Sequence, residues 1–193
     1  MEPAHIRDAK RELRRQIRAR LQHLTPGERA AASAQARSLL ERQTVWQQAQ
    51  SILFFAPLPE ELDIWPLVQA ALAAEKTAAL PRFTVEANGY AAGEIKYLAG
   101  DLRPGRFGIR EPGEHCRAIP PKRLDFVLAP GVAFDLRGRR LGRGKGFYDR
   151  LLALVRGTIC GVAFDEQIVG EIPVAPHDVG VNCILTPTRW IEL

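Results

Sequence analysis

Hydrophobic residues near the N-terminus recur at the spacing of one helix face. Between residues 4 and 24 they are three, four or seven positions apart, at Ile6, Leu13, Ile17, Leu21 and Leu24. This spacing forms one stripe of an amphipathic helix, and lysine and arginine crowd the remaining positions. The pattern therefore predicts a basic N-terminal helix.

A second helix is predicted to start directly afterwards. Thr25 fits an N-cap, Pro26 fits the first helical position, and Glu28 completes a capping box. We expect this helix to run to about Gln43.

Short, continuous apolar runs predict buried strands farther along the chain. The run at 51–56 ends before Pro57 and has the composition of a strand covered on both faces of a sheet. A helix over 63–75 is predicted to follow it. Similar runs occur at 77–81, 125–129, 158–164 and 181–185, and 91–98 has the pattern of a more peripheral strand.

The alternation of strands and helices predicts an α/β fold. We expect a single three-layer domain over 1–193, with a mostly parallel open sheet flanked by helices and the helix of residues 1–24 packed on it. In such sheets, ligands bind beyond the carboxyl ends of the strands. The proline- and glycine-rich stretch 103–121 is the longest irregular segment, which makes it a candidate binding loop.

Composition narrows the choice of partners. A formal net charge of +5 suits nucleic acid, an acidic membrane surface or small anionic ligands. No apolar run approaches the about 20 residues of a membrane span, and the N-terminus lacks the apolar stretch of a signal peptide. We therefore expect a cytoplasmic protein, with Cys116, Cys160 and Cys183 reduced because they are widely spaced.

Glycine and positive charge are concentrated after the run at 125–129. Arg140 and Leu141 precede an alternation of Gly142, Arg143, Gly144, Lys145 and Gly146. Glycine lets backbone N–H groups converge on an anion, and arginine grips phosphate oxygens in bidentate fashion. The spacing fits neither a Walker A motif nor a dinucleotide fingerprint. It indicates polyphosphate binding, with a flexible basic turn as the alternative.

Three residues near this loop or on the first helix allow two interpretations each. Lys10 and Arg14, four positions apart, would share a helix face, either as a triphosphate clamp or as a solvated basic surface. Asp149 stands at a predicted helix start, where it could cap the helix or hold Mg²⁺.

Taken in order, these motifs resemble the 5-formyltetrahydrofolate cyclo-ligase family, also called methenyltetrahydrofolate synthetase. The segment 125–150, with LAPGVAFD followed by RLGRGKGFYD, closely resembles the family signature. Further family motifs occur in the same order at 10–14, 60–63, 80–82, 107–112, 161–164, 172–173 and 177–178. The resemblance extends over about residues 9 to 186.

The resemblance implies conversion of 5-formyltetrahydrofolate to 5,10-methenyltetrahydrofolate with ATP and Mg²⁺, releasing ADP and phosphate through a phosphorylated formyl intermediate. The expected partners are ATP and the folate, including polyglutamylated forms. We expect a monomer with no nucleic-acid or membrane partner. The alternatives are a non-catalytic nucleotide- or nucleic-acid-binding protein and a sugar-phosphate enzyme on a similar scaffold.

The resemblance also assigns roles to residues. The ATP site would comprise Lys10, Arg14, Arg140, Leu141, Gly142, Arg143, Gly144, Lys145, Gly146, Phe147 and Tyr148, with Arg143 and Lys145 acting in catalysis. The folate would contact Ala56, Glu61, Phe107 and Phe147, and Mg²⁺ would be held by Asp149 and Asp178. Simpler interpretations are a helix-start carboxylate for Glu61, core packing for the phenylalanines and an exposed turn at Asp178.

Overall fold

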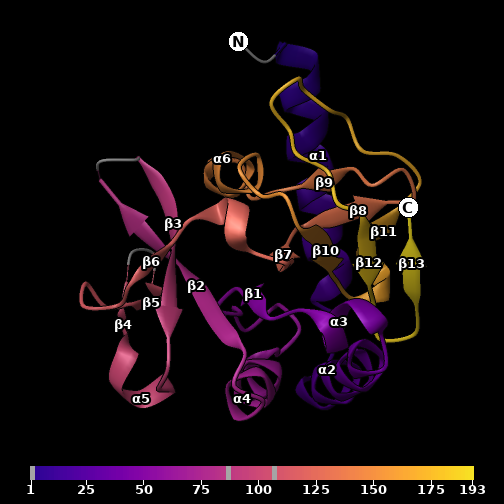
Figure 1. Ribbon diagram of the computed structural model, residues 1–193. Coiled ribbons are helices and arrows are strands. Elements are labelled where there is room, and N and C mark those ends of the chain that lie inside the picture. The colour runs from indigo at the N-terminus through magenta and orange to yellow at the C-terminus, as the bar shows by residue number, and fades with distance from the viewer. Residues whose placement is uncertain (1–2, 86–87, 106–107) are drawn as a thin grey trace.

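An eight-stranded sheet forms the centre of the computed structural model, which describes residues 3–85, 88–105 and 108–193. The strand order is β13-β12-β10-β7-β1-β2-β3-β6 (Figure 1). The central strands run parallel: β1 Ser51–Leu53, β2 Thr77–Thr84, β7 Phe126–Pro130, β10 Thr158–Val162 and β12 Cys183–Leu185. Antiparallel strands complete the edges: β3 Gly89–Ile95, β6 Ala118–Ile119 and β13 Trp190–Glu192. The predicted α/β class with a mostly parallel sheet is confirmed.

Successive residues of the central strands pack into two different hydrophobic clusters. In β1, Ile52 belongs to one cluster and Leu53 to the other, and Phe126 and Val127 of β7 divide in the same way. Because neighbouring side chains of a strand point to opposite faces, the sheet is covered on both sides. This is why the central strands have continuous apolar sequences.

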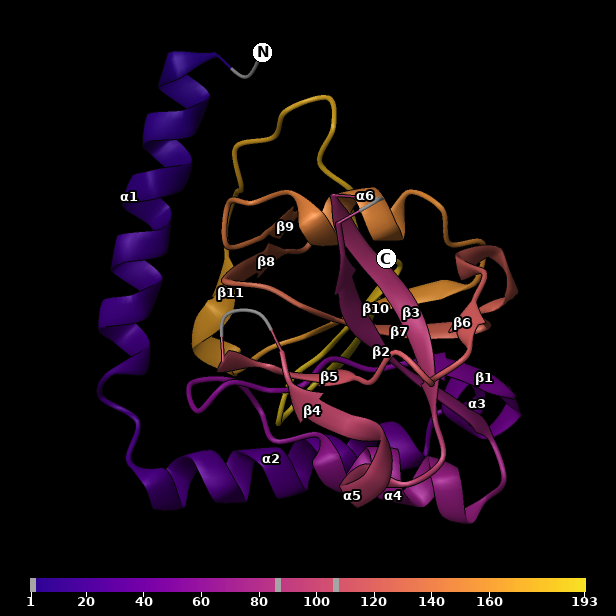
Figure 2. The same ribbon diagram turned by 90° about the vertical axis from the view of Figure 1, so that its left-hand side faces the viewer.

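Helices supply the cover on each face of the sheet. One cluster receives side chains from α1 Ala4–Leu21, α2 Pro26–Glu41, α3 Thr44–Gln48 and α4 Trp65–Ala73. The opposite cluster receives Leu151 and Leu152 of α6 Phe147–Leu152. Figure 2 shows α1 standing along the side of the molecule, with α2 running beneath the rest of the chain. Ile17 and Leu21 anchor the C-terminal half of α1 in the core.

The start of α2 has the capping box that its sequence predicts. The Thr25 hydroxyl accepts the Glu28 N–H at 3.2 Å, and the Glu28 carboxylate accepts the Thr25 N–H at 2.8 Å. These reciprocal bonds satisfy backbone donors that lack partners inside the helix.

Several short strands lie where no strand was predicted. A small sheet has the order β11-β8-β9, with β8 Ala133–Asp135, β9 Arg140–Leu141 and β11 Ile168–Val169. The expectation that 103–121 is irregular was wrong. A short helix, α5 Leu98–Asp101, leads into a hairpin of β4 Leu102–Pro104 and β5 Arg110–Pro112, and β6 also falls in this segment. Strands of two or three residues are too short to display a period.

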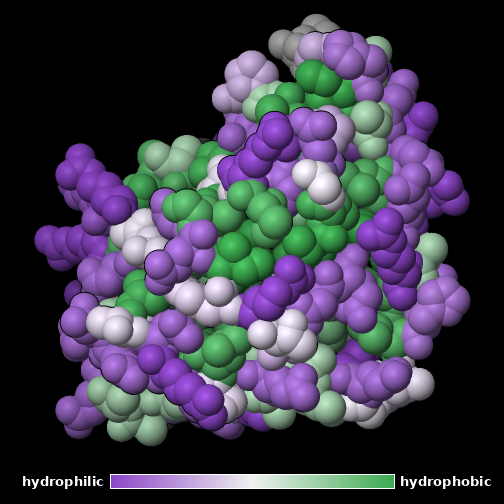
Figure 3. Space-filling model, turned by 90° about the vertical axis from the view of Figure 1, so that its right-hand side faces the viewer, coloured by the Kyte–Doolittle hydropathy of each residue, from purple (hydrophilic) through white to green (hydrophobic). Residues whose placement is uncertain are grey.

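The surface carries some exposed apolar side chains. Figure 3 shows a band of hydrophobic surface crossing one face, with hydrophilic side chains around it. Large exposed hydrophobic residues in the described ranges are Val85, Tyr97, Leu136, Leu154, Val174 and Leu193. None of the helices in these ranges has both the length and the hydrophobicity needed to span a bilayer.

Candidate active site

A pocket opens where the chain switches direction across the sheet. From β1 the chain first adds β2 on one side and later returns to add β7 on the other. Phe55 and Ala56, which follow β1, and Pro130 and Gly131, at the end of β7, line a cavity of about 320 Å³. Open α/β sheets place their ligands at such a switch point, because the loops beyond the two strands diverge there.

The glycine-rich loop forms one wall of this pocket. It joins β9 to α6, and Gly142, Gly144 and Gly146 all line the cavity. Gly144 has φ of +100° and Gly146 has φ of +64°. Glycine reaches these left-handed conformations without the strain that a Cβ would introduce. The loop can therefore present its backbone to a ligand, as the predicted phosphate cradle requires.

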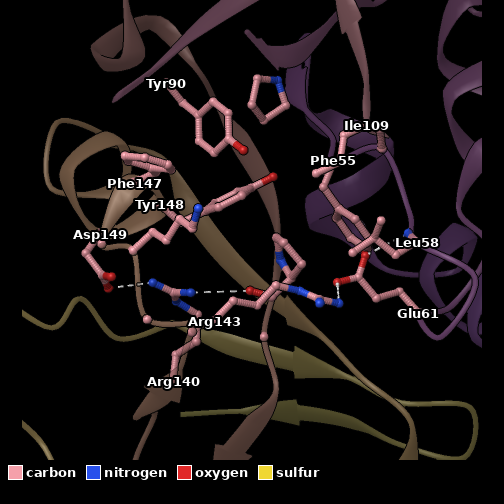
Figure 4. Close-up of a pocket in the computed structure, with 18 of the residues that line it drawn as sticks. Phe55, Leu58, Glu61, Tyr90, Ile109, Arg140, Arg143, Phe147, Tyr148 and Asp149 are labelled. Atoms are coloured by element: carbon pink, nitrogen blue, oxygen red, sulfur yellow. Dashed lines mark hydrogen bonds and ion pairs between the residues drawn. The ribbon is translucent and has the colours of Figure 1, made fainter. Parts of the chain in front are cut away.

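Arg143 reaches from this loop across to the turn that follows β1. Its Nη2 donates to Oε1 of Glu60 and to Oε1 of Glu61, each at 3.0 Å, and Oε2 of Glu61 accepts the Leu58 N–H at 2.9 Å (Figure 4). Burial raises the pKa of Glu61, while the Leu58 N–H and the Arg143 guanidinium oppose that rise. The carboxylate proposed for folate is thus held by a residue proposed for ATP.

The side chain of Arg140 forms an ion pair with the carboxylate of Asp149. Its Nη2 lies 2.5 Å from Oδ1 of Asp149, its Nη1 donates to the Pro130 carbonyl at 3.3 Å, and its side chain is 1% exposed. The Val179 N–H also donates to Oδ1 of Asp149, at 3.3 Å. Arg140 lines the pocket, but these bonds use its guanidinium to hold Asp149 in place.

Helix α1 contributes the side chains predicted to clamp a triphosphate. Lys10 lies 2.5 Å from Oδ2 of Asp178, which also accepts the Ala175 N–H at 2.6 Å. Arg14 donates to the Gly142 carbonyl at 2.8 Å. Lys10 and Arg14 therefore share the helix face that meets the glycine-rich loop and the segment around Asp178.

Aromatic rings form a second wall. Phe147 and Tyr148 of α6 lie beside Tyr90 of β3, with ring centroids 5.5 and 5.4 Å from that of Tyr90 and edge-to-face geometry. Phe83 of β2 continues the cluster, 5.3 Å from Phe147. Burial raises the pKa of Tyr148 well above its usual value, so its hydroxyl remains a donor at neutral pH. Figure 4 shows the rings of Tyr90, Phe147 and Tyr148 on the opposite side of the pocket from Glu61.

The structure brings most of the predicted site residues to one place. Ala56, Glu61, Arg140, Arg143, Lys145, Phe147, Tyr148, Asp149 and the three loop glycines line the pocket. Leu141 is fully buried in the core, and its carbonyl accepts the Val132 N–H at 2.7 Å. Lys10, Arg14 and Asp178 are grouped beside the loop, outside the lining. Phe107 lies outside the described residues.

Other lining residues were not assigned to the site from the sequence. Ile109 and Glu111 come from the segment 103–121, whose composition already marked it as a candidate binding loop. Glu111 accepts the Phe83 N–H at 3.0 Å, which links this segment to the aromatic wall. Phe55 and Tyr90 have no comparable signal, since Phe55 belongs to the apolar run at 51–56 and Tyr90 directly precedes the strand predicted at 91–98.

The fold and pocket define an α/β protein whose small-molecule site combines a glycine-rich, cationic loop with acidic and aromatic walls. The sequence profile of the 5-formyltetrahydrofolate cyclo-ligase family matches residues 6–187. The chain belongs to this family of enzymes, which confirms the resemblance found in its motifs.

Known proteins similar to the chain support this assignment. It is 32% identical to the 5-formyltetrahydrofolate cyclo-ligase of Escherichia coli K12, over 91% of this chain and 99% of that protein. The match to the enzyme of the same name from Mycolicibacterium smegmatis is 42% identical over 101 residues, which is 50% of this chain and 51% of that protein. The NMR structure of Aquifex aeolicus 5,10-methenyltetrahydrofolate synthetase is 35% identical, with a TM-score of 0.85 over 95% of this chain and 92% of that one.

Proposed function

We propose that this protein converts 5-formyltetrahydrofolate to 5,10-methenyltetrahydrofolate at the expense of ATP. In the proposed reaction the formyl oxygen attacks the γ-phosphorus of ATP and ADP leaves. N10 of the folate then attacks the formyl carbon, and the oxygen departs with the phosphoryl group as inorganic phosphate. Family membership over residues 6–187 supports the substrate, and the pocket supports the chemistry.

The observation that carries this proposal is the bridge from Arg143 to Glu61. Arg143 belongs to the glycine-rich loop, whereas Glu61 belongs to the turn after β1, and the two are 3.0 Å apart. A phosphate-binding loop and an acceptor suited to the N–H groups of a pterin therefore border one cavity. Phosphoryl transfer requires such positioning, together with positive charge where the transferring group becomes most negative.

Each wall of the pocket has a role in this proposal. Arg143 and Lys145 would stabilise the transferred phosphoryl group, and the loop glycines would donate backbone N–H groups to the phosphates. Glu61 would accept hydrogen bonds from the pterin, while Phe147 and its aromatic neighbours would pack against the folate rings. No side chain needs to act as a nucleophile.

The carboxylates beside the loop fit a Mg²⁺ ion. Mg²⁺ prefers oxygen ligands and usually takes one or two carboxylates together with phosphate oxygens and water. Asp149 lines the pocket, and its Oδ1 accepts the N–H of Val179, the residue that follows Asp178. Asp149 and Asp178 would hold the ion, whose charge would offset that of the phosphates. Arg140 and Lys10 would then keep these carboxylates in position.

A direct absorbance assay on the protein and two matched variants tests the proposed function. The purified protein is mixed with 5-formyltetrahydrofolate, ATP and Mg²⁺, and the near-ultraviolet absorbance of the methenyl product is followed. Lys145→Ala removes a cation that lines the pocket. Arg137→Ala removes one that is 75% exposed and pairs with Glu171 at 3.7 Å, outside the pocket.

We expect the unmodified protein and Arg137→Ala to form product only with ATP. Lys145→Ala should lose at least about a hundredfold in turnover, the size of effect known for removing one charge-stabilising group, while its circular dichroism stays unchanged. Absence of ATP-dependent product from the folded, unmodified protein would refute the proposed reaction. Full activity of Lys145→Ala would refute only the role of that lysine.

A further inference from the structure

Three side chains of different metal-binding types meet beside the β4–β5 hairpin, outside the active-site pocket. Nε2 of His115 lies 3.1 Å from Oδ1 of Asp101 and 3.6 Å from Sγ of Cys116. All three ligand atoms lie within 4.8 Å of one another. We propose that Asp101, His115 and Cys116 form a binding site for Zn²⁺ or a closely similar transition-metal ion.

The separations between these atoms fit a tetrahedral zinc ion. Zinc bonds are about 2.0–2.1 Å long to oxygen and nitrogen and about 2.3 Å long to sulfur. At tetrahedral angles these lengths place nitrogen and sulfur about 3.6 Å apart, and nitrogen and oxygen about 3.3–3.4 Å apart. The observed separations, 3.6 Å and 3.1 Å, differ from these values by at most a few tenths of an ångström. The oxygen and sulfur atoms lie within 4.8 Å of each other, compared with about 3.6 Å around a tetrahedral zinc ion, so a movement of at most about 1.2 Å closes the site around the ion.

Asp101 is held in the orientation that such a site requires. Its Oδ2 accepts the N–H groups of Lys96 at 2.6 Å and Tyr97 at 2.8 Å, which turns Oδ1 toward His115. Hydrogen bonds that fix a ligand from behind are a regular feature of metal sites. Asp101 is therefore oriented before any ion arrives.

The turn that carries the other two ligands is tied to the same place. The Gly113 N–H donates to the Asp101 carbonyl at 2.8 Å, and the Cys116 N–H donates to the Gly113 carbonyl at 3.0 Å. A Cβ on Gly113 would lie 2.7 Å from Cε1 of His115, so this position must be glycine for the ring to lie where it does. The His115 side chain is 49% exposed, which leaves room for a water molecule as the fourth ligand.

The ligand set distinguishes this site from the carboxylates of the pocket. A thiolate and an imidazole favour zinc and related transition metals, whereas Mg²⁺ favours oxygen alone. On binding, the ion would replace the Cys116 thiol proton, which passes to solvent, and the thiolate and carboxylate would balance its charge. The guanidinium of Arg82 also faces this turn, where it donates to the carbonyls of Gly113 and Cys116 at 2.6 and 3.2 Å. The positive charge of Arg82 favours the thiolate form of Cys116, but it also weakens the attraction of the site for a metal cation.

The bound ion would have a structural role. Asp101 ends α5, and His115 and Cys116 follow β5, so the ion would join the two ends of the β4–β5 hairpin. The hairpin segment carries Ile109 and Glu111 to the active-site pocket. Binding would therefore stabilise one wall of that pocket without contacting it.

Cobalt and zinc binding to the full-length, reduced protein test the site. Co²⁺ is added in the presence of excess Mg²⁺, which occupies oxygen-only sites, and the absorption spectrum is recorded. A Co²⁺–thiolate bond gives a near-ultraviolet charge-transfer band, and tetrahedral Co²⁺ gives strong visible bands. The thermal midpoint is then measured with and without Zn²⁺. The variants are Cys116→Ser and His115→Ala. His23→Ala is the matched control, because His23 is exposed and belongs to no metal-binding cluster among the described residues.

We expect one equivalent of Co²⁺ with the charge-transfer band, and a higher thermal midpoint with Zn²⁺, because an ion that binds only the folded state stabilises it. Cys116→Ser should lose the band, and His115→Ala should bind at least about tenfold more weakly, the usual effect of disturbing a metal site. His23→Ala should behave as the unmodified protein does. If the unmodified protein shows no charge-transfer band, or if His115→Ala binds as tightly, the proposal is wrong. His115 is half exposed, so its variant gives this answer even if Cys116→Ser does not fold.

Discussion

Nη2 of Arg143 and Oε1 of Glu61 lie 3.0 Å apart, which closes an ion pair between the glycine-rich loop and the turn after β1. Glu61 is the more buried partner, with its side chain 12% exposed compared with 43% for Arg143. A change at Arg143 must therefore alter the ionisation of Glu61.

The pH dependence of folate binding should reveal this link. Burial raises the pKa of Glu61, Arg143 lowers it, and the neighbouring Glu60 carboxylate raises it. Arg143→Gln should raise the pKa of Glu61 further, so that binding of 5-formyltetrahydrofolate without ATP is lost at a higher pH as the solution is acidified. Glu60→Gln should shift the acid limb to lower pH. Titration calorimetry across the acid range checks both, and shifts in the same direction would contradict the ion-pair account.

Gly144→Ala should impair ATP binding. Gly144 has φ of +100°, where a residue with a Cβ is strained by about 1–3 kcal/mol, so the loop must change shape. Gly27→Ala is the matched control, because Gly27 lies in the first turn of α2 with no atom near its added Cβ. We expect a higher KM for ATP in Gly144→Ala, and a slightly more stable protein with normal KM in Gly27→Ala. Equal KM values for the two variants would remove the loop from the ATP site.

Tyr90→Ala should weaken folate binding more than ATP binding. Tyr90 lines the pocket and holds Phe147 and Tyr148 through edge-to-face contacts. Such contacts contribute about 1 kcal/mol, which corresponds to about a fivefold rise in the KM for 5-formyltetrahydrofolate. Tyr97→Ala, at a side chain outside the pocket lining that is 71% exposed, is the control and should change neither KM. A larger effect of Tyr90→Ala on ATP would assign the aromatic wall to the nucleotide.

Asp125→Ala should lower stability without changing either KM. Asp125 lies at the amino end of β7, away from the pocket, and its Oδ2 accepts the N–H groups of Gln50 and Ser51 and the Ser51 hydroxyl, at 3.0, 2.9 and 2.9 Å. Loss of these bonds should lower the free energy of unfolding by about 1 kcal/mol, a small effect for three hydrogen bonds because the site is exposed. Asp8→Ala removes an exposed pair with Arg11 and should cost less than that. Urea unfolding measures both.

The loss in Asp125→Ala should depend on pH. Desolvation acts to raise the pKa of Asp125, but bonds from Ser51 and Gln50 prevail and lower it. A lowered pKa in the folded state contributes stability above the unfolded value of about 4, and this contribution disappears as the pH falls through the folded value. The difference between unmodified protein and variant should therefore shrink below about pH 4. A stability difference that stays constant with pH would show that the charge of the Asp125 carboxylate does not contribute to stability.

The features that could be predicted from the sequence are those that constrain the residue types of several neighbouring positions at once. Strands buried on both faces need continuous apolar runs, so β1 and β7 could be located, and the capping box located the start of α2. The glycine-rich loop was recognisable because its conformation demands glycine. Side-chain direction could not be predicted in this way: nothing in the sequence indicates that Arg140 faces Asp149, or that Tyr90 in β3 turns toward α6.

Lys10 and Asp178 are 168 positions apart in the chain, yet their side chains are 2.5 Å apart in the folded protein. Because synthesis runs from the N-terminus, α1 is made well before the loop that carries Asp178, and this side of the pocket cannot form until that loop has been made. Contacts so distant along the chain close late in folding, because a long loop must first be ordered. A nascent chain stalled before Asp178 should therefore lack this ion pair, even with β1, β2, β7 and β10 already synthesised.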